Sequence, residues 1–268
     1  MSASVHPGMG ANPFEGGASF RVWAPFADTV CVAGTFNGWS DSENALKNEG
    51  NGIWSGDIPS ARIGDQYKFV LTGKFIQGKL WKNDPYARSL TNSVGNSIIA
   101  AGDFDWTQAG YRTPAWNEMV IYELHVGSFL FAPNSSSGRG NFDTVISKLD
   151  YLADLGINVI QLLPSDEFPG DISMGYNPSY IFAIEESYGG PNGLRRLVDA
   201  AHCKGIAIIF DVVYNHFGPS DLDLWQFDGW SENGNGGIYF YNDWRRKTPW
   251  GDTRPDYGRG RSASIYRR

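Results

Sequence analysis

The chain has 268 residues, of which 41% are hydrophobic and 19% are charged, a balance typical of a folded globular protein rather than a disordered one. Its formal net charge of −7 argues against a nucleic-acid partner, because proteins that bind polyanions usually present a basic surface. The aromatic content is high: 10 Trp, 13 Tyr and 16 Phe accompany 33 Gly and 14 Pro. This mixture favours all-β modules, long loops and flat stacking surfaces, which suit sugars.

The ends of the chain and its cysteines give no sign of export. Residues 1–17 lack a basic segment followed by an apolar run, and no stretch of 18 apolar residues occurs, so neither a signal peptide nor a membrane partner is expected. We therefore predict a cytoplasmic protein with a flexible segment over residues 1–17. Cys31 and Cys203 are too far apart in sequence to indicate a disulfide framework or a metal motif, and both are expected to be buried thiols.

The first part of the chain predicts an antiparallel β-sandwich over residues 18–105. Short apolar or alternating runs are separated by clusters of Gly, Asn, Asp and Pro, which is typical of such sandwiches. These runs are ASFRVWAP (18–25), DTVCVAG (28–34), GIWSGDI (52–58) and QYKFVLTG (66–73). No helical period interrupts them, so the sandwich is expected to be a domain of its own, followed by a linker over residues 106–117.

Beyond the linker the pattern alternates between strands and helices. Apolar runs begin at residues 119, 157 and 206, and between them apolar residues recur at helical spacing. That alternation predicts a parallel sheet, whose strands are buried on both faces. The third run, IAIIFDVV (206–213), is interrupted by Asp211 and is followed by Asn215 and His216. Ligand sites of α/β sheets lie at the carboxyl ends of the strands, although Asp and Asn at a strand end often do no more than form turns.

Five stretches of the chain resemble the α-amylase superfamily, glycoside hydrolase family 13. They are FRVWAPFADTVCVAGTFNGW (20–39), YELHVGSF (122–129), LGINVIQLLP (155–164), MGYNPSYIF (174–182) and SYGGPNGLRRLVDAAHCKGIAIIFDVVYNHFGP (187–219). The first is similar to the family-48 carbohydrate-binding module that precedes the barrel in isoamylases, trehalohydrolases and branching enzymes. The resemblance implies an N-terminal immunoglobulin-like β-sandwich, followed over residues 118–268 by the first three βα units of a (β/α)8 barrel.

The resemblance also implies roles for four residues. His216 would bond a hydroxyl of the glucose at the cleavage point, and Tyr176 would form the flat platform beneath that ring. Asp211 would orient an arginine from the next strand. Asn215 matches a calcium ligand in many amylases and a structural residue in branching enzymes, and we assign neither a metal nor another cofactor to this chain.

The residues that break the glycosidic bond in this family are not found in the sequence. Retaining hydrolysis needs two carboxyl groups roughly 5 Å apart, and the family takes its catalytic acids from the fourth, fifth and seventh strands. A complete barrel needs about 250 residues, and no fourth strand is predicted here. Glu123, Asp166 and Glu167 are expected to be ordinary solvated acids, because charged side chains are mostly exposed. No catalytic residue is therefore assigned.

The last eight residues, RSASIYRR (261–268), depart from the helix start that the resemblance implies. One codon choice for them, read one base later, encodes Glu-Val-Arg-Gln-Tyr-Ile-Ala, which resembles that helix start. The hypothesis is a frame-shifted tail on a C-terminally truncated chain.

Three functions remain open from the sequence. The first is an α-glucan-active enzyme of the branching type in glycogen metabolism, with trehalohydrolase or debranching hydrolase as the alternative, and its partner would be glycogen, amylose or a maltooligosaccharide. The second is a non-catalytic α-glucan-binding protein, in which Trp54 and Trp81 of the sandwich would stack on glucose rings while Trp23 fills the core. The third is an interaction module whose aromatic residues face a protein.

Overall fold

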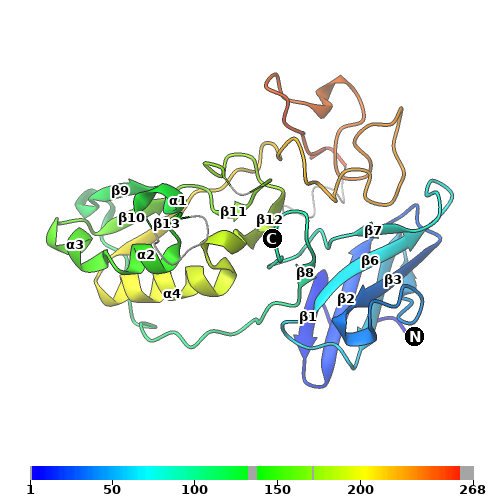
Figure 1. The fold of residues 1–268 in the computed structure, drawn as a ribbon, viewed down its shortest axis with the longest axis horizontal. Helices are drawn as coiled ribbons and strands as arrows, with labels where there is room; N and C mark the ends of the chain where they lie inside the picture. The colour runs from blue at the N-terminus through cyan, green and yellow to red at the C-terminus, as the bar shows by residue number, and fades with distance from the viewer. Residues whose placement is uncertain (1, 132–137, 171, 260–268) are drawn as a thin grey trace.

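The computed structural model describes residues 2–131, 138–170 and 172–259. The proposed frame-shifted tail lies outside these residues. Within them, a β-rich half made from the first hundred residues lies beside an α/β half, and the segment after residue 211 returns to the β-rich half (Figure 1).

Two antiparallel sheets form the β-rich half. One has the order β1-β2-β5-β4, and the other has the order β3-β6-β7 with β8 also paired to β6. Their bounds are β1 Gly10–Phe14, β2 Gly17–Trp23, β3 Thr29–Gly34, β4 Lys47–Gly50, β5 Ile53–Ile58, β6 Gln66–Thr72, β7 Leu80–Lys82 and β8 Ser97–Ile98, with a 3-10 turn η1 at Thr35–Asn37. Fully buried Phe20, Val32 and Phe69 lie in the core of this sandwich. All four strands expected from the apolar runs are present.

The N-terminal segment is not flexible throughout, and the expectation for residues 1–17 is wrong over Gly10–Phe14. Strand β1 pairs with β2 along its whole length. It is also held by a buried carboxylate, because the Ala11 N–H donates to Asp84 Oδ2 at 3.1 Å. The sequence signal was weak because β1 contains Gly and Pro, which are depleted in strands.

The α/β half is built on a three-stranded parallel sheet of order β13-β10-β9. The central strand β10 (Val159–Leu162) pairs with β9 (Ile121–Leu124) and β13 (Ala207–Phe210), so Val159 lies opposite both Ile121 and Ala207. The helices are α1 Val126–Phe129, α2 Phe142–Ile146, α3 Leu149–Asp154 and α4 Gly190–Cys203, with 3-10 turns η2 Trp116–Glu118, η3 Glu186–Tyr188 and η4 Trp244–Arg246. Phe142, Leu162 and Leu197 are buried together between sheet and helices.

Strands β9 and β13 form the two edges of this sheet within the described residues. Ile121 on β9 and Val212 just beyond β13 remain exposed. This order of strands is consistent with the first three βα units of a barrel. The cysteines differ from expectation, since Cys31 is buried but Cys203, at the end of α4, is exposed.

Among the described residues, the predicted linker and residues 211–259 both connect the halves, and Tyr180 and Ile181 of β12 (Tyr180–Ile184) also lie in the sandwich core. The predicted linker runs along α4 (Figure 1), where Thr107 donates to Asp199 and Tyr111 stacks on His202 with ring centroids 3.9 Å apart. Residues 211–259 contain no strand, but they are not a loose loop. Phe217, Phe227 and Phe240 are fully buried in the same core as the sandwich residues, so the sandwich supplies the surface on which this segment folds.

Candidate functional site

Tyr176 and Asp211 are brought together at the carboxyl end of the parallel sheet. Asp211 directly follows β13, and Tyr176 belongs to the segment between the short antiparallel pair β11 (Asp166–Glu167) and β12 (Tyr180–Ile184). The Tyr176 hydroxyl donates to Asp211 Oδ2 at 3.2 Å. Partial desolvation, and then the negative charge of Asp211, raise the pKa of Tyr176. The ring is 44% exposed, so one flat surface is available beside a carboxylate.

His216 is nearly buried next to this pair. Its Nε2 lies 2.7 Å from the Tyr176 carbonyl oxygen and 3.3 Å from Asp252 Oδ2, and its Nδ1 contacts the Asn215 side-chain oxygen. The imidazole therefore fixes the position of the Tyr176 backbone. A glucose hydroxyl that bonds His216 would have to share or replace one of these contacts, because both ring nitrogens already face protein oxygens.

Two further residues complete the group and were not singled out from the sequence. The Trp250 ring lies 5.6 Å from the His216 ring at an interplanar angle of 80°, and its indole N–H donates to Asp252 Oδ2 at 2.8 Å. Trp250 is 68% exposed. The only sequence signal was the motif TPWGD (248–252), which lies far from the strand ends along the chain. We call Tyr176, Asp211, His216, Trp250 and Asp252 the strand-end site.

Asn215 is exposed, and its side-chain oxygen contacts His216 Nδ1. In the ranges that the structure describes, no three His, Cys, Asp or Glu side chains gather as a metal site would require. Asn215 therefore lies beside the strand-end site, and we assign it no metal.

Asp166 and Glu167 are buried, which corrects the expectation that they are solvated. They are 3% and 1% exposed, and Asp166 Oδ2 has no hydrogen-bond partner among the described residues. Burial raises the pKa of Asp166 to about 8. Burial and the nearby negative charge of Glu185 raise the pKa of Glu167 to about 9. Burial therefore favours the protonated form of both carboxyls at neutral pH. Glu123 is exposed as expected.

The sandwich tryptophans divide into core and surface residues. Trp54 is 7% exposed and its indole N–H donates to the Ala24 carbonyl at 3.0 Å, so it is a core residue without a face for a sugar. Trp23 packs half-buried against Tyr239 of the returning segment. Trp81 is 37% exposed and lies 6.5 Å from Trp39, between ring centroids. We call the pair Trp39 and Trp81 the sandwich platform.

No helix among the described residues is long and apolar enough to cross a membrane.

Comparison with known proteins gives a consistent family. The model for the alpha amylase catalytic domain matches residues 86–249, and the model for carbohydrate-binding module 48, the isoamylase N-terminal domain, matches residues 8–87. The chain is 35% identical to a malto-oligosyltrehalose trehalohydrolase of Saccharolobus solfataricus over 89% of its own length and 38% of that enzyme's. It is also 35% identical to the 1,4-alpha-glucan branching enzyme GlgB of Corynebacterium efficiens, over 91% of its length and 33% of that enzyme's.

A solved structure agrees with these sequence matches. The crystal structure of a putative alpha amylase from Salmonella typhimurium superposes with a TM-score of 0.77 at 28% identity, covering 96% of this chain and 40% of that one. The chain spans between a third and two fifths of the length of these relatives. Since the catalytic-domain model covers more than half of the residues and the module precedes it, the chain belongs to the α-amylase family of glycosidases and glucanotransferases, with a family-48 carbohydrate-binding module at its N-terminal end.

Proposed function

We propose that these 268 residues bind α-1,4-glucan and belong to the lineage of the 1,4-α-glucan branching enzymes, which act in glycogen metabolism. The observation that carries the proposal is the strand-end site. It places an exposed tyrosine ring, a carboxylate, a histidine and an exposed tryptophan ring within one group of contacts. Aromatic faces beside hydrogen-bonding groups suit the alternating C–H and hydroxyl surfaces of a glucose unit. We keep the cytoplasm as the proposed location.

The trehalohydrolase lineage is the second candidate, because a trehalohydrolase and a branching enzyme are equally identical to this chain at 35%. A debranching lineage fits the same fold. A protein-binding module without sugar affinity would account for the exposed aromatic residues. It would not explain why Tyr176, Asp211 and His216 lie together.

Replacing Tyr176 by Ala should weaken glucan binding about fivefold, because one stacking surface contributes on the order of 1 kcal/mol. The measurement is retardation of the purified chain in gels containing amylose or glycogen, with the dissociation constant obtained from the dependence on glucan concentration. Tyr151 on α3 is a matched control, since it is a tyrosine with 60% exposure outside the site. Equal retardation of Y176A and Y151A would show that the strand-end site takes no part in glucan binding. If the unmodified chain is not retarded at all, the proposal as a whole is refuted.

We further expect binding without turnover. A glycosyl intermediate needs a nucleophile and an acid/base carboxyl roughly 5 Å apart. The resemblance takes those groups from strands beyond the third, and Asp211 and Asp252 are already bonded to Tyr176 and His216. Incubation with amylose should produce no new reducing ends and no change in iodine colour. Activity that persists through repurification and remains proportional to the amount of this chain would contradict this expectation.

A further inference from the structure

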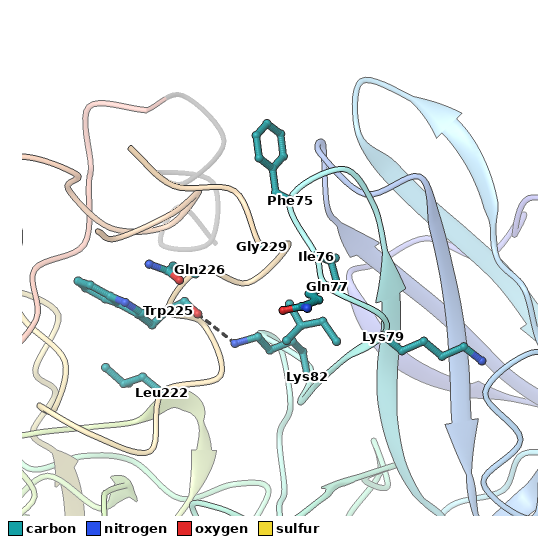
Figure 2. A pocket seen from close by; sticks show the side chains of 10 residues that line it. Phe75, Ile76, Gln77, Lys79, Lys82, Leu222, Trp225, Gln226 and Gly229 are labelled. Atoms are coloured by element: carbon teal, nitrogen blue, oxygen red, sulfur yellow. Dashed lines mark hydrogen bonds between the residues drawn. The ribbon is translucent and has the colours of Figure 1, made fainter. Parts of the chain in front are cut away.

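A cavity of about 420 Å³ lies between the sandwich and the segment that returns to it (Figure 2). Strand β7 and the connection from β6 line it on one side, and residues 222–229 line it on the other. Its volume falls within the range of small-molecule sites. Because no residue of the strand-end site lines it, this cavity can have a ligand of its own.

The amine in this cavity belongs to Lys82 of β7. Lys82 is 9% exposed and is the one buried lysine among the residues that the structure describes. Its Nζ donates to the Trp225 carbonyl oxygen at 3.0 Å (Figure 2). The other lysine of the lining, Lys79, is exposed and pairs with Asp41 at 2.6 Å, and Figure 2 shows its amine directed away from Lys82.

Lys82 forms no ion pair with a carboxylate in the described part of the chain, in contrast to Lys79. The acids whose charges act on Lys82 are Asp223 and Asp228, and each is bonded to a backbone N–H elsewhere. Asp223 Oδ2 accepts from the Asn83 N–H at 2.7 Å, and Asp228 Oδ2 accepts from the Phe26 N–H at 3.0 Å. A buried ammonium group without an ion pair is costly, so this position favours the neutral amine.

The electrostatic surroundings of Lys82 agree with this geometry. Burial lowers the pKa of Lys82 and the positive charge of Lys68 lowers it further, while Asp223 and Asp228 act in the opposite direction. A neutral amine is a nucleophile, and a lysine in a desolvated pocket is activated in this way. One N–H is directed at Trp225, so the lone pair of the tetrahedral nitrogen points away from that carbonyl and remains free to attack.

The lining indicates the kind of molecule that the cavity would hold. Leu80, Leu222 and Trp225 supply apolar surface. Gln77 and Gln226 supply amides, which donate and accept hydrogen bonds. The negative charges of Asp223 and Asp228 disfavour an anion beside Lys82. A small neutral molecule with a compact apolar body and a hydroxyl group matches this lining.

We propose that Lys82 is a covalent modification site, at which the cavity holds a small neutral aldehyde and the amine converts it to an imine. Nζ attacks the carbonyl carbon and the C–N bond forms. The carbonyl oxygen leaves as water, together with the two hydrogens of the neutral amine. The reaction is reversible and needs neither an oxidant nor a reductant. This site lies beyond glucan binding and does not depend on it.

The test measures how fast each lysine of the complete chain reacts with 3-hydroxybenzaldehyde, which is neutral near pH 7. Sodium cyanoborohydride reduces each imine to a stable secondary amine, and peptide mass spectrometry then gives the rate at each position. Lys82 should be labelled at least about fivefold faster than Lys79, because its amine is neutral more of the time and binding brings the aldehyde close to it. The rate at Lys82 should also saturate as the aldehyde concentration rises.

Two controls separate the fold and the cavity from the chemistry of lysine itself. In urea, where the chain is unfolded, Lys82 and Lys79 should react at equal rates. Lys82→Arg keeps a cation and a donor for the Trp225 carbonyl, so labelling at position 82 should vanish while the rate at Lys79 stays the same. The anionic analogue 3-formylbenzoate should label Lys82 with less advantage over Lys79, because Asp223 and Asp228 repel it.

Three results would overturn the proposal. Equal labelling of Lys82 and Lys79 in the folded chain would show that the Lys82 amine is not activated. A rate at Lys82 that rises linearly with aldehyde concentration, without saturation, would show that the cavity does not hold the aldehyde before it reacts. A greater advantage with 3-formylbenzoate would assign the cavity to anions. None of these measurements involves glucan, so failure of glucan retention in gels would refute the proposed function and leave this site unaffected.

Discussion

Raising the pH from about 5 to about 8 should lower the free energy of unfolding by several kcal/mol, up to about 8 kcal/mol, because of Asp166 and Glu167. In the folded chain their pKa values lie near 8 and 9, whereas their ordinary values are 3.8 and 4.5. Between those limits the folded chain retains protons that the unfolded chain releases. The contribution of these two groups to stability is therefore fully present below pH about 4 and is lost as the pH rises toward the folded pKa values. One proton corresponds to about 1.4 kcal/mol per pH unit.

The measurement is urea unfolding followed by tryptophan fluorescence at several pH values in this range. Asp166→Asn keeps the shape of the side chain but cannot ionise, so its stability should fall less steeply with pH and should exceed that of the unmodified chain at pH about 8. Asp103→Asn provides the control, since Asp103 is an exposed acid of the segment before the linker. Parallel pH profiles for D166N and the unmodified chain would show that Asp166 is ionised or solvated in the folded state.

Substitution of Gly175 by Ala should disrupt the loop that carries Tyr176, with a loss of several kcal/mol in stability and of most glucan retention. Gly175 has a φ of +86°, and a Cβ built there would lie 1.8 Å from the Pro164 carbonyl oxygen, at the end of the segment that follows β10. Backbone atoms cannot swing aside as the end of a side chain can. The loop must therefore move away from β10, and with it the ring of Tyr176 and the carbonyl that contacts His216.

Gly156 offers a matched control for this substitution. Its φ of +89° is nearly the same, but a Cβ there would meet no atom within 4 Å. Gly156→Ala should thus show only the cost of the left-handed backbone, about 1 kcal/mol. Similar unfolding midpoints for G175A and G156A would mean that the contact with Pro164 relaxes easily and that the loop is not fixed by close approach.

Strand and helix positions could be predicted from the sequence wherever hydrophobic periodicity is strong. The apolar runs at 18–25 and 206–213 form β2 and β13. A short run that is apolar at alternate or at successive positions predicts a strand, because a sheet buries those side chains on one face or on both. Strand β1 was missed because its stability comes from pairing with β2 and from the distant carboxylate of Asp84, neither of which leaves a local pattern.

The candidate site was predicted in part. Tyr176, Asp211 and His216 were connected through family motifs, and the structure places them in contact. Trp250 and Asp252 could not be placed beside His216 from sequence, because more than thirty residues without secondary-structure periodicity separate them. Likewise the sequence named Trp54 and Trp81 as surface residues, and only the fold showed that the Trp54 ring is in the core while Trp39 lies beside Trp81.

By itself, then, the sequence determined the family, the order of a β-rich module before a parallel α/β sheet, and the residue types at the ends of its strands, because these depend on local periodicity and short motifs. Tertiary structure alone decided which acids are buried, which tryptophans face solvent, and how residues 211–259 fold on the sandwich. Burial depends on which surfaces meet across long separations in the chain. Two hydrogen bonds of 3.0 Å show such contacts between residues more than a hundred positions apart. One joins Lys82 to Trp225 and the other joins Phe26 to Asp228.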